Sequence, residues 1–162
     1  MPIVPASPED RDAVTELLGR APQAEFEVAR RSLAGRPVVL RNAPLLNDGT
    51  PMPTRYWLVD PDLVRRVGAL EAAGGVRAAE AAVDPVALDD AHRRYAAARD
   101  ADLPAEHVGP RPYGGVGGTR RGVKCLHAHL AHTLAGGEDP VGEWVLDRLA
   151  AEAAAAAPGD RP

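Results

Sequence analysis

The dipeptide Asp-Pro occurs three times in this chain, at Asp60-Pro61, Asp84-Pro85 and Asp139-Pro140. Aspartate is a preferred N-cap residue, because its carboxylate accepts hydrogen bonds from the free amide groups of the first helical turn. Proline suits the first helical position, since it has no amide hydrogen to leave unpaired. The three dipeptides therefore predict helices that cover about residues 61–73, 85–100 and 140–156.

The first half of the chain carries one helix signal and three strand signals. Ser7-Pro8 shows the same N-cap pattern, and Gly19 marks the end of that helix. Strand-forming runs follow at residues 25–31, 37–41 and 55–59, with turns between them. Short strands joined by turns favour an antiparallel sheet. We therefore predict an α+β fold, in which a small antiparallel sheet of about three strands packs against four to five helices.

Length and charge narrow the class of protein. A chain of 162 residues is long enough for one domain with its own core, so residues 1–162 are predicted to form a single domain. Its Ala-rich tail, residues 150–162, is expected to fray. The net charge of −4 argues against nucleic-acid binding. No signal pattern and no apolar run of about 20 residues occur, so we expect a cytoplasmic protein without a membrane segment.

A short motif concentrates the reactive side chains. The only lysine, the only cysteine and three of the five histidines lie in Lys124-Cys-Leu-His-Ala-His-Leu-Ala-His132. With Gly136-Gly137 as its end, the segment predicts a helix over about residues 123–135. On that helix Cys125, His129 and His132 would share one face. A thiolate and two imidazoles are zinc ligands, so these residues form a candidate site for a zinc-like divalent metal.

The motif also permits two other interpretations. A helix N-terminus and an adjacent lysine favour the thiolate form of a cysteine, so Cys125 with His127 or His132 could act as a catalytic group. Alternatively, Cys125 is a small buried residue, and the histidines are hydrogen-bonded core or surface residues. Whether the protein is an enzyme therefore stays open.

The glycine-rich loop before the motif predicts an anion site. Glycines let backbone amides approach an anion, and the following helix N-terminus carries partial positive charge. Arg120, Arg121 and Lys124 add three full charges. The loop lacks the sequence of a P-loop. The alternative is a flexible linker with solvated arginines.

Several segments between about residues 18 and 149 resemble the actinobacterial family known as domain of unknown function 501. The most specific strings are Asp48-Gly-Thr-Pro-Met-Pro-Thr-Arg-Tyr56 and Val123-Lys-Cys-Leu-His127, and Leu70-Glu71 also matches. The resemblance implies a small cytoplasmic protein. Genes of this family tend to lie beside those of a septum-formation initiator and an exopolyphosphatase-like protein, which implies partners related to cell division or polyphosphate. No activity follows from the resemblance.

The resemblance also bears on the metal site. Typical members carry a Cys where this chain has Ser32, and a Cys or His where it has Asp60. It therefore implies a four-ligand site made of those two positions, Cys125, and His127 or His132. Here Ser32 is a poor ligand and Asp60 a harder one. His129 is not a general feature of the family.

Three functional hypotheses follow. The first is a binding or regulatory module with a small-anion or metal site around Lys124–His132. The second is an enzyme that acts on a phosphorylated or anionic substrate through Cys125 or a histidine. The third is a structural interaction protein linked to cell division. The expected partners are small anions, metal ions or proteins of those pathways, and neither nucleic acid nor a membrane.

Overall fold

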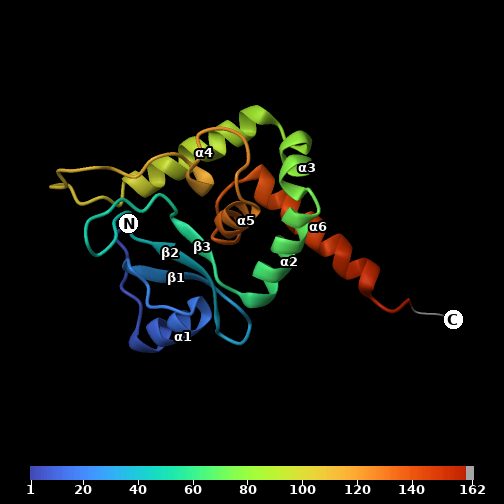
Figure 1. Ribbon diagram of the computed structural model, residues 1–162, viewed down its shortest axis with the longest axis horizontal. Helices are drawn as coiled ribbons and strands as arrows, with labels where there is room; N and C mark the ends of the chain where they lie inside the picture. Colours follow the sequence, from blue (N-terminus) through green and yellow to red (C-terminus); the bar gives the residue numbers. More distant parts are fainter. Residues whose placement is uncertain (160–162) are drawn as a thin grey trace.

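The computed structural model describes residues 1–159 (Figure 1). Its helices and strands follow one another in the order α1 (Pro8–Leu18), β1 (Phe26–Arg31), β2 (Pro37–Asn42), β3 (Tyr56–Leu58), α2 (Pro61–Ala72), α3 (Gly75–Ala82), α4 (Pro85–Asp100), the short 3₁₀ helix η1 (Val116–Gly118), α5 (Leu126–Leu134) and α6 (Pro140–Ala156). The α+β class and the three strands are as the sequence predicts.

The sheet is antiparallel, with the strands in chain order β1-β2-β3. Phe26 of β1 pairs with Asn42 of β2, and Val39 of β2 pairs with Leu58 of β3. The central strand β2 is buried at residues 37–40, on both of its faces. A strand that is buried on both faces reads as a continuous apolar run, as Pro37-Val-Val-Leu does here.

Two helices cover the two faces of the sheet (Figure 1). Helix α1 packs on one face, where Val14 contacts a cluster that contains Phe26 and Leu40. Helix α5 packs on the other face, where Ala131 lies against Val39. Helix α5 is therefore the element that joins the sheet to the remaining helices.

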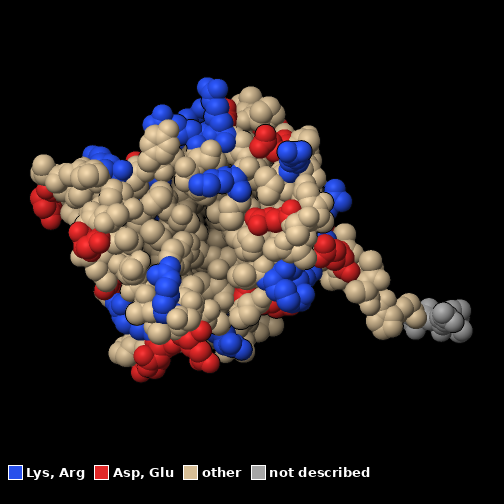
Figure 2. Space-filling view, in the orientation of Figure 1, with Lys and Arg blue, Asp and Glu red and all other residues tan. Residues whose placement is uncertain are grey.

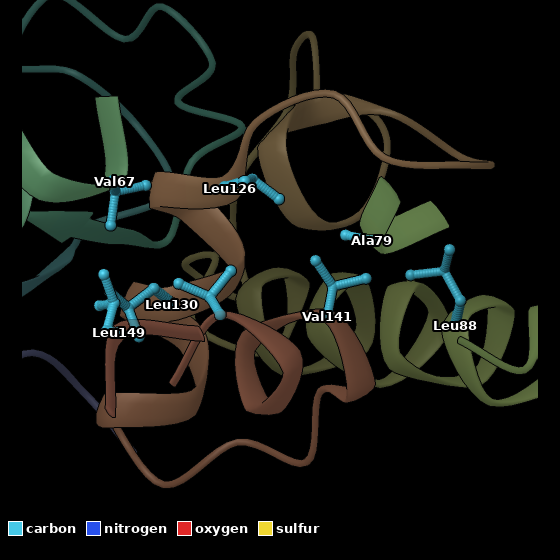
Figure 3. Packing of buried hydrophobic residues seen from close by; sticks show 8 residues of the cluster. Val67, Ala79, Leu88, Leu126, Leu130, Val141 and Leu149 are labelled. Carbon is cyan, nitrogen blue, oxygen red and sulfur yellow. The ribbon is translucent and has the colours of Figure 1, made fainter. Parts of the chain in front are cut away.

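The larger core is helical and surrounds α5 (Figure 3). Leu126 and Leu130 of α5 are fully buried there. Their neighbours come from α2, α3, α4 and α6: Val67, Ala79, Leu88, Val141, Val145 and Leu149. A helix with apolar partners on nearly every side must itself be apolar around most of its circumference. The small residues Ala128 and Ala131 let α5 fit between these layers.

All three Asp-Pro dipeptides open helices, as predicted. Asp60 accepts a hydrogen bond from the Leu63 amide at 2.9 Å. Asp84 caps α4 through the amides of residues 86 and 87. Asp139 caps α6 through those of residues 141 and 142. The prolines that follow occupy the first helical positions.

The prediction of four to five helices was too low, because the structure contains six α-helices within residues 1–159. The additional helix is α3. Gly74-Gly75 was expected only to end α2, but α3 begins directly at Gly75. Gly74 has φ of +88°, which turns the chain sharply without a loop. Gly75 packs so closely that a Cβ there would lie 2.5 Å from the Leu70 carbonyl oxygen.

Helix α5 begins at Leu126, three residues later than predicted. Two carboxylates hold the preceding chain in a non-helical path: Glu80 accepts from the Val123 amide, and Glu71 accepts from the Leu126 amide, each at 2.7 Å. Cys125 is therefore the N-cap residue, with an extended backbone at φ −149° and ψ 118°.

The Ala-rich tail is helical as far as Ala156, where the predicted helix also ends, and it is exposed along residues 150–156; its fraying stays a prediction. The rest of that expectation, at residues 160–162, lies outside the described residues. Within residues 1–159, none of the helices combines the length and apolarity needed to cross a membrane.

Candidate functional site

Three potential metal ligands converge where α2 meets the start of α5. They are the Glu71 carboxylate, the Cys125 thiol and the His127 imidazole, whose donor atoms all lie within 4.8 Å of one another. The Cys125 Sγ is 3.9 Å from His127 Nδ1, and that nitrogen is 3.2 Å from Glu71 Oε1. Within residues 1–159 this is the one group of three such residues.

The second nitrogen of His127 is fixed by the backbone. His127 Nε2 lies 3.0 Å from the Val64 carbonyl oxygen, to which it donates. The hydrogen bond to Cys125, together with the Val64 carbonyl and the Glu71 charge, raises the pKa of His127 to about 9, although burial lowers it. The imidazole nitrogen that faces Cys125 and Glu71 therefore sits where positive charge is favoured.

Glu71 has a second role in the local fold. Cys125 makes no side-chain cap for α5, and the Glu71 carboxylate accepts from the first amide of that helix instead. A carboxylate at a helix N-terminus is favourable, because it complements the partial positive charge there. Glu71 thus positions the start of α5 and, with it, the Cys125 side chain.

Two of the three side chains, those of Cys125 and His127, line a pocket of about 310 Å³. In the space-filling view it lies in the hollow at the centre of the face shown, between β3 and α5 (Figure 2). Cys125 is half-buried at this pocket. The lining residues are Thr54, Tyr56, Trp57, Leu58, Val64, Gly117, Cys125, His127 and Ala128. Most of these walls are apolar or aromatic, which is usual for small-molecule pockets.

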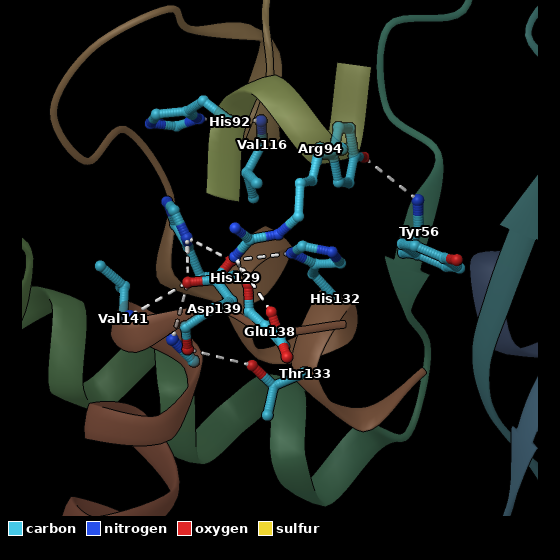
Figure 4. A network of polar contacts seen from close by, with 12 residues as sticks. Tyr56, His92, Arg94, Val116, His129, His132, Thr133, Glu138, Asp139 and Val141 are labelled. Carbon is cyan, nitrogen blue, oxygen red and sulfur yellow. Dashed lines mark hydrogen bonds and ion pairs between the residues drawn. The ribbon is translucent and has the colours of Figure 1, made fainter. Parts of the chain in front are cut away.

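The other two histidines of the motif point into the core instead (Figure 4). His129 Nδ1 lies 2.8 Å from Asp139 Oδ2, and His132 Nδ1 lies 3.0 Å from the same oxygen. Burial alone would raise the pKa of Asp139, but the hydrogen bonds from both histidines lower it below its usual range. The carboxylate is therefore ionised and shared by α5 and α6.

Aromatic rings enclose this buried network. His132 stacks on Tyr56 at 5.8 Å between ring centroids, and Tyr95 meets His132 edge-on at 5.1 Å. His92 meets His129 edge-on at 5.7 Å. The fixed contacts and deep burial make these residues a structural link between α4, α5 and α6.

The predicted metal set is not brought together. Because Cys125 precedes α5, it does not share a helix face with His129 and His132, which bind Asp139 instead. Asp60 caps α2 and is absent from the convergent group. Ser32, the other position implied by the family resemblance, lies in the turn between β1 and β2, where its hydroxyl accepts from the Arg36 amide.

The predicted anion residues are also separated. Arg120 lies over the Tyr113 ring, 4.0 Å from its centroid, and lines a second pocket. Arg121 and Lys124 are exposed and do not line that pocket. The backbone amides expected to bind the anion at this helix start already donate to Glu71 and Glu80.

The site residue that sequence reasoning missed is Glu71. Its segment, Leu70-Glu71, belongs to the strings that resemble the family, and this match was the only available signal. No spacing rule connects it with His127, since the two are 56 residues apart in the chain.

Comparisons with known proteins agree with the motif analysis. The family model described as protein of unknown function (DUF501) matches residues 28–147. No curated protein and no solved structure matches the chain. The match covers more than half of the sequence and includes Glu71, Cys125 and His127. This chain therefore belongs to the family of proteins of unknown function DUF501.

Proposed function

We propose that the protein is a metal-binding module, in which Glu71, Cys125 and His127 hold a zinc-like divalent ion. The observation that carries this proposal is the convergence of the three donor atoms within 4.8 Å. A thiolate, an imidazole and a carboxylate all belong to the ligand set of zinc. The Glu71 carboxylate and the Cys125 thiolate carry negative charge. The imidazole of His127 is in contact with both, and its raised pKa means that positive charge is favoured at this point.

The distances support the fit. Zinc lies about 2.3 Å from sulfur and about 2.0–2.2 Å from nitrogen and oxygen, so tetrahedral ligands lie roughly 3.6 Å (S to N) and 3.4 Å (N to O) apart. The corresponding distances here are 3.9 Å for Cys125 Sγ to His127 Nδ1 and 3.2 Å for His127 Nδ1 to Glu71 Oε1. Side-chain shifts of a few tenths of an ångström would bring the donors into place.

Hydrogen bonds around the three donors add support. Metal-binding histidines usually donate their other ring N–H to a carbonyl or a carboxylate, which orients the ring. His127 does so to the Val64 carbonyl. Glu71 accepts from the Leu126 amide, which fixes its carboxylate in a similar way. The donors are thus held in position by α2 and by the first turn of α5.

Three protein ligands leave a fourth tetrahedral position, and the 310 Å³ pocket borders Cys125 and His127. Closed structural zinc sites use four protein ligands, whereas sites that bind an exogenous group keep one position open. We therefore assign the pocket to a small molecule with one metal-binding group and an apolar body that contacts Trp57 and Leu58.

The test is a zinc titration of untagged protein, followed by metal analysis after dialysis. We expect one zinc ion per chain. Cys125→Ser, and separately Glu71→Gln, should weaken binding by more than about 100-fold, because even changes around the ligands of a metal site cost about 10–100-fold. His107→Gln is the matched control: the His107 ring hydrogen-bonds to the Pro110 carbonyl and is not one of the three converging donors, so the substitution should leave affinity unchanged. Wild-type affinity in Cys125→Ser would contradict the proposal.

A second candidate function is supported by the position of the Cys125 sulfur. It lies beside an imidazole and borders a pocket, which is the arrangement of a nucleophilic cysteine. Iodoacetamide alkylation with and without zinc separates the two candidates. Protection by one equivalent of zinc supports the metal site. Rapid alkylation that zinc does not slow, and that His127→Gln does slow, supports the nucleophile.

A further inference from the structure

A second pocket, of about 380 Å³, lies between α4 and the segment of residues 112–120. It is separate from the proposed metal site: Gly114 and Gly115 line this pocket, whereas Gly117 lines the other. Its lining residues are His92, Arg93, Ala96, Arg99, Asp100, Pro112, Tyr113, Gly114, Gly115 and Arg120. Figure 2 shows Lys and Arg side chains gathered along this edge of the molecule, over α4 and the following segment.

The pocket is built by a buried arginine. Arg99 is 1% exposed, and its guanidinium donates to the Gly114 carbonyl at 2.7 Å and to the Pro53 carbonyl at 3.1 Å. These bonds hold residues 112–114 against α4. Arg99 also donates to Asp100 at 2.9 Å, and within residues 1–159 this is the one carboxylate that lines the pocket. The negative charge of Asp100 is thereby neutralised by the buried Arg99.

Two further arginines give the pocket a net positive charge. The Arg120 guanidinium lies over the Tyr113 ring, 4.0 Å from its centroid, and this cation–π contact orients it in advance. Within residues 1–159, Arg120 has no carboxylate partner, so its N–H groups are available. Arg93 enters from α4, and it pairs with Asp90 at the exposed helix surface.

His92, which also lines the pocket, has a structural role in its wall. His92 Nδ1 accepts from the Val116 amide at 3.1 Å, and His92 Nε2 donates to the Gly122 carbonyl at 2.9 Å. Both ring nitrogens are therefore occupied, and this histidine fixes the glycine segment without being a ligand.

We propose that this pocket binds a small molecule through a phosphate or pyrophosphate group, with Arg120 and Arg93 as the contacting residues. Guanidinium groups match the oxygens of phosphate with two parallel hydrogen bonds, and such charge-assisted bonds are the stronger ones. Ala96 and Pro112 provide an apolar wall for the organic part of the ligand. The volume lies in the range of small-molecule sites.

Calorimetric titration with pyrophosphate at low ionic strength, in the presence of EDTA, tests this proposal. We expect saturable binding of one pyrophosphate per chain. Arg120→Gln should weaken it by at least about 10-fold, because a charge-assisted contact is lost. The matched control is Arg121→Gln, which removes the same charge from the adjacent exposed residue outside the pocket. Its effect should stay below about twofold. Melting curves without ligand confirm that both variants fold.

Three outcomes would overturn the proposal. Equal losses in Arg120→Gln and Arg121→Gln would show a diffuse effect of surface charge. Tighter binding of succinate than of pyrophosphate would show a carboxylate site. Loss of binding in Cys125→Ser would place the anion at the proposed metal site. Retained binding in Cys125→Ser supports this pocket whether or not zinc binds elsewhere.

Discussion

At the scale of single residues, the buried Asp139 carboxylate has the clearest energetic role. It accepts hydrogen bonds from His129 and His132 and from two backbone amides of α6. Asp139→Asn places an amide group against the histidine donors, so we expect the free energy of unfolding to fall by about 3 kcal/mol. Urea denaturation at pH 6–7 measures this loss.

The same residue predicts a dependence on pH. The pKa of Asp139 is lower in the folded protein than its ordinary value of 3.8, so its contribution to stability is complete above about pH 5 and is lost as the pH falls below that value. The stability difference between wild type and Asp139→Asn should therefore narrow from pH 5 to pH 3. Asp147→Asn, on the exposed side of α6, should show no such narrowing. A constant difference would mean that the carboxylate is not ionised in the fold.

At the scale of elements, the helix starts depend on their capping aspartates. Asp84 is exposed, and its carboxylate accepts from the first-turn amides of α4. Asp84→Ala should lower the free energy of unfolding by about 1 kcal/mol, whereas Asp84→Asn should restore most of it, because asparagine also caps helices. Urea denaturation of the two variants checks this. Equal losses in both would mean that charge near Asp84, and not capping, provides the stabilisation.

At the scale of the whole molecule, α5 links the sheet core to the helical core. We therefore expect the two cores to unfold together in one transition. Leu130→Ala, in the helical core, should lower the free energy of unfolding by about 2–5 kcal/mol. Val14→Ala, in the core between α1 and the sheet, should lower the midpoint of the same unfolding transition. Leu146→Ala is the control, because Leu146 is 37% exposed. Two separate transitions, each shifted by one substitution, would show two independent units.

The sequence by itself determined where most elements begin and that the three strands form an antiparallel sheet. The reason is that capping and turn formation are local: Asp60, Asp84 and Asp139 bind amides two or three residues away. It also identified the reactive motif, because rare residues such as Cys125 can be counted without a structure.

Only the tertiary structure decided which of these residues meet. Glu71 contacts Leu126 and His127 across more than 50 residues of chain, and it delays the start of α5, so Cys125 leaves the predicted helix face. Asp139 shows the same limit. Its role as the N-cap of α6 could be predicted from the neighbouring Pro140, but its hydrogen bonds with two histidines depend on how α6 packs on α5. Contacts between elements are set by packing of the whole core, and no local pattern in the sequence encodes them.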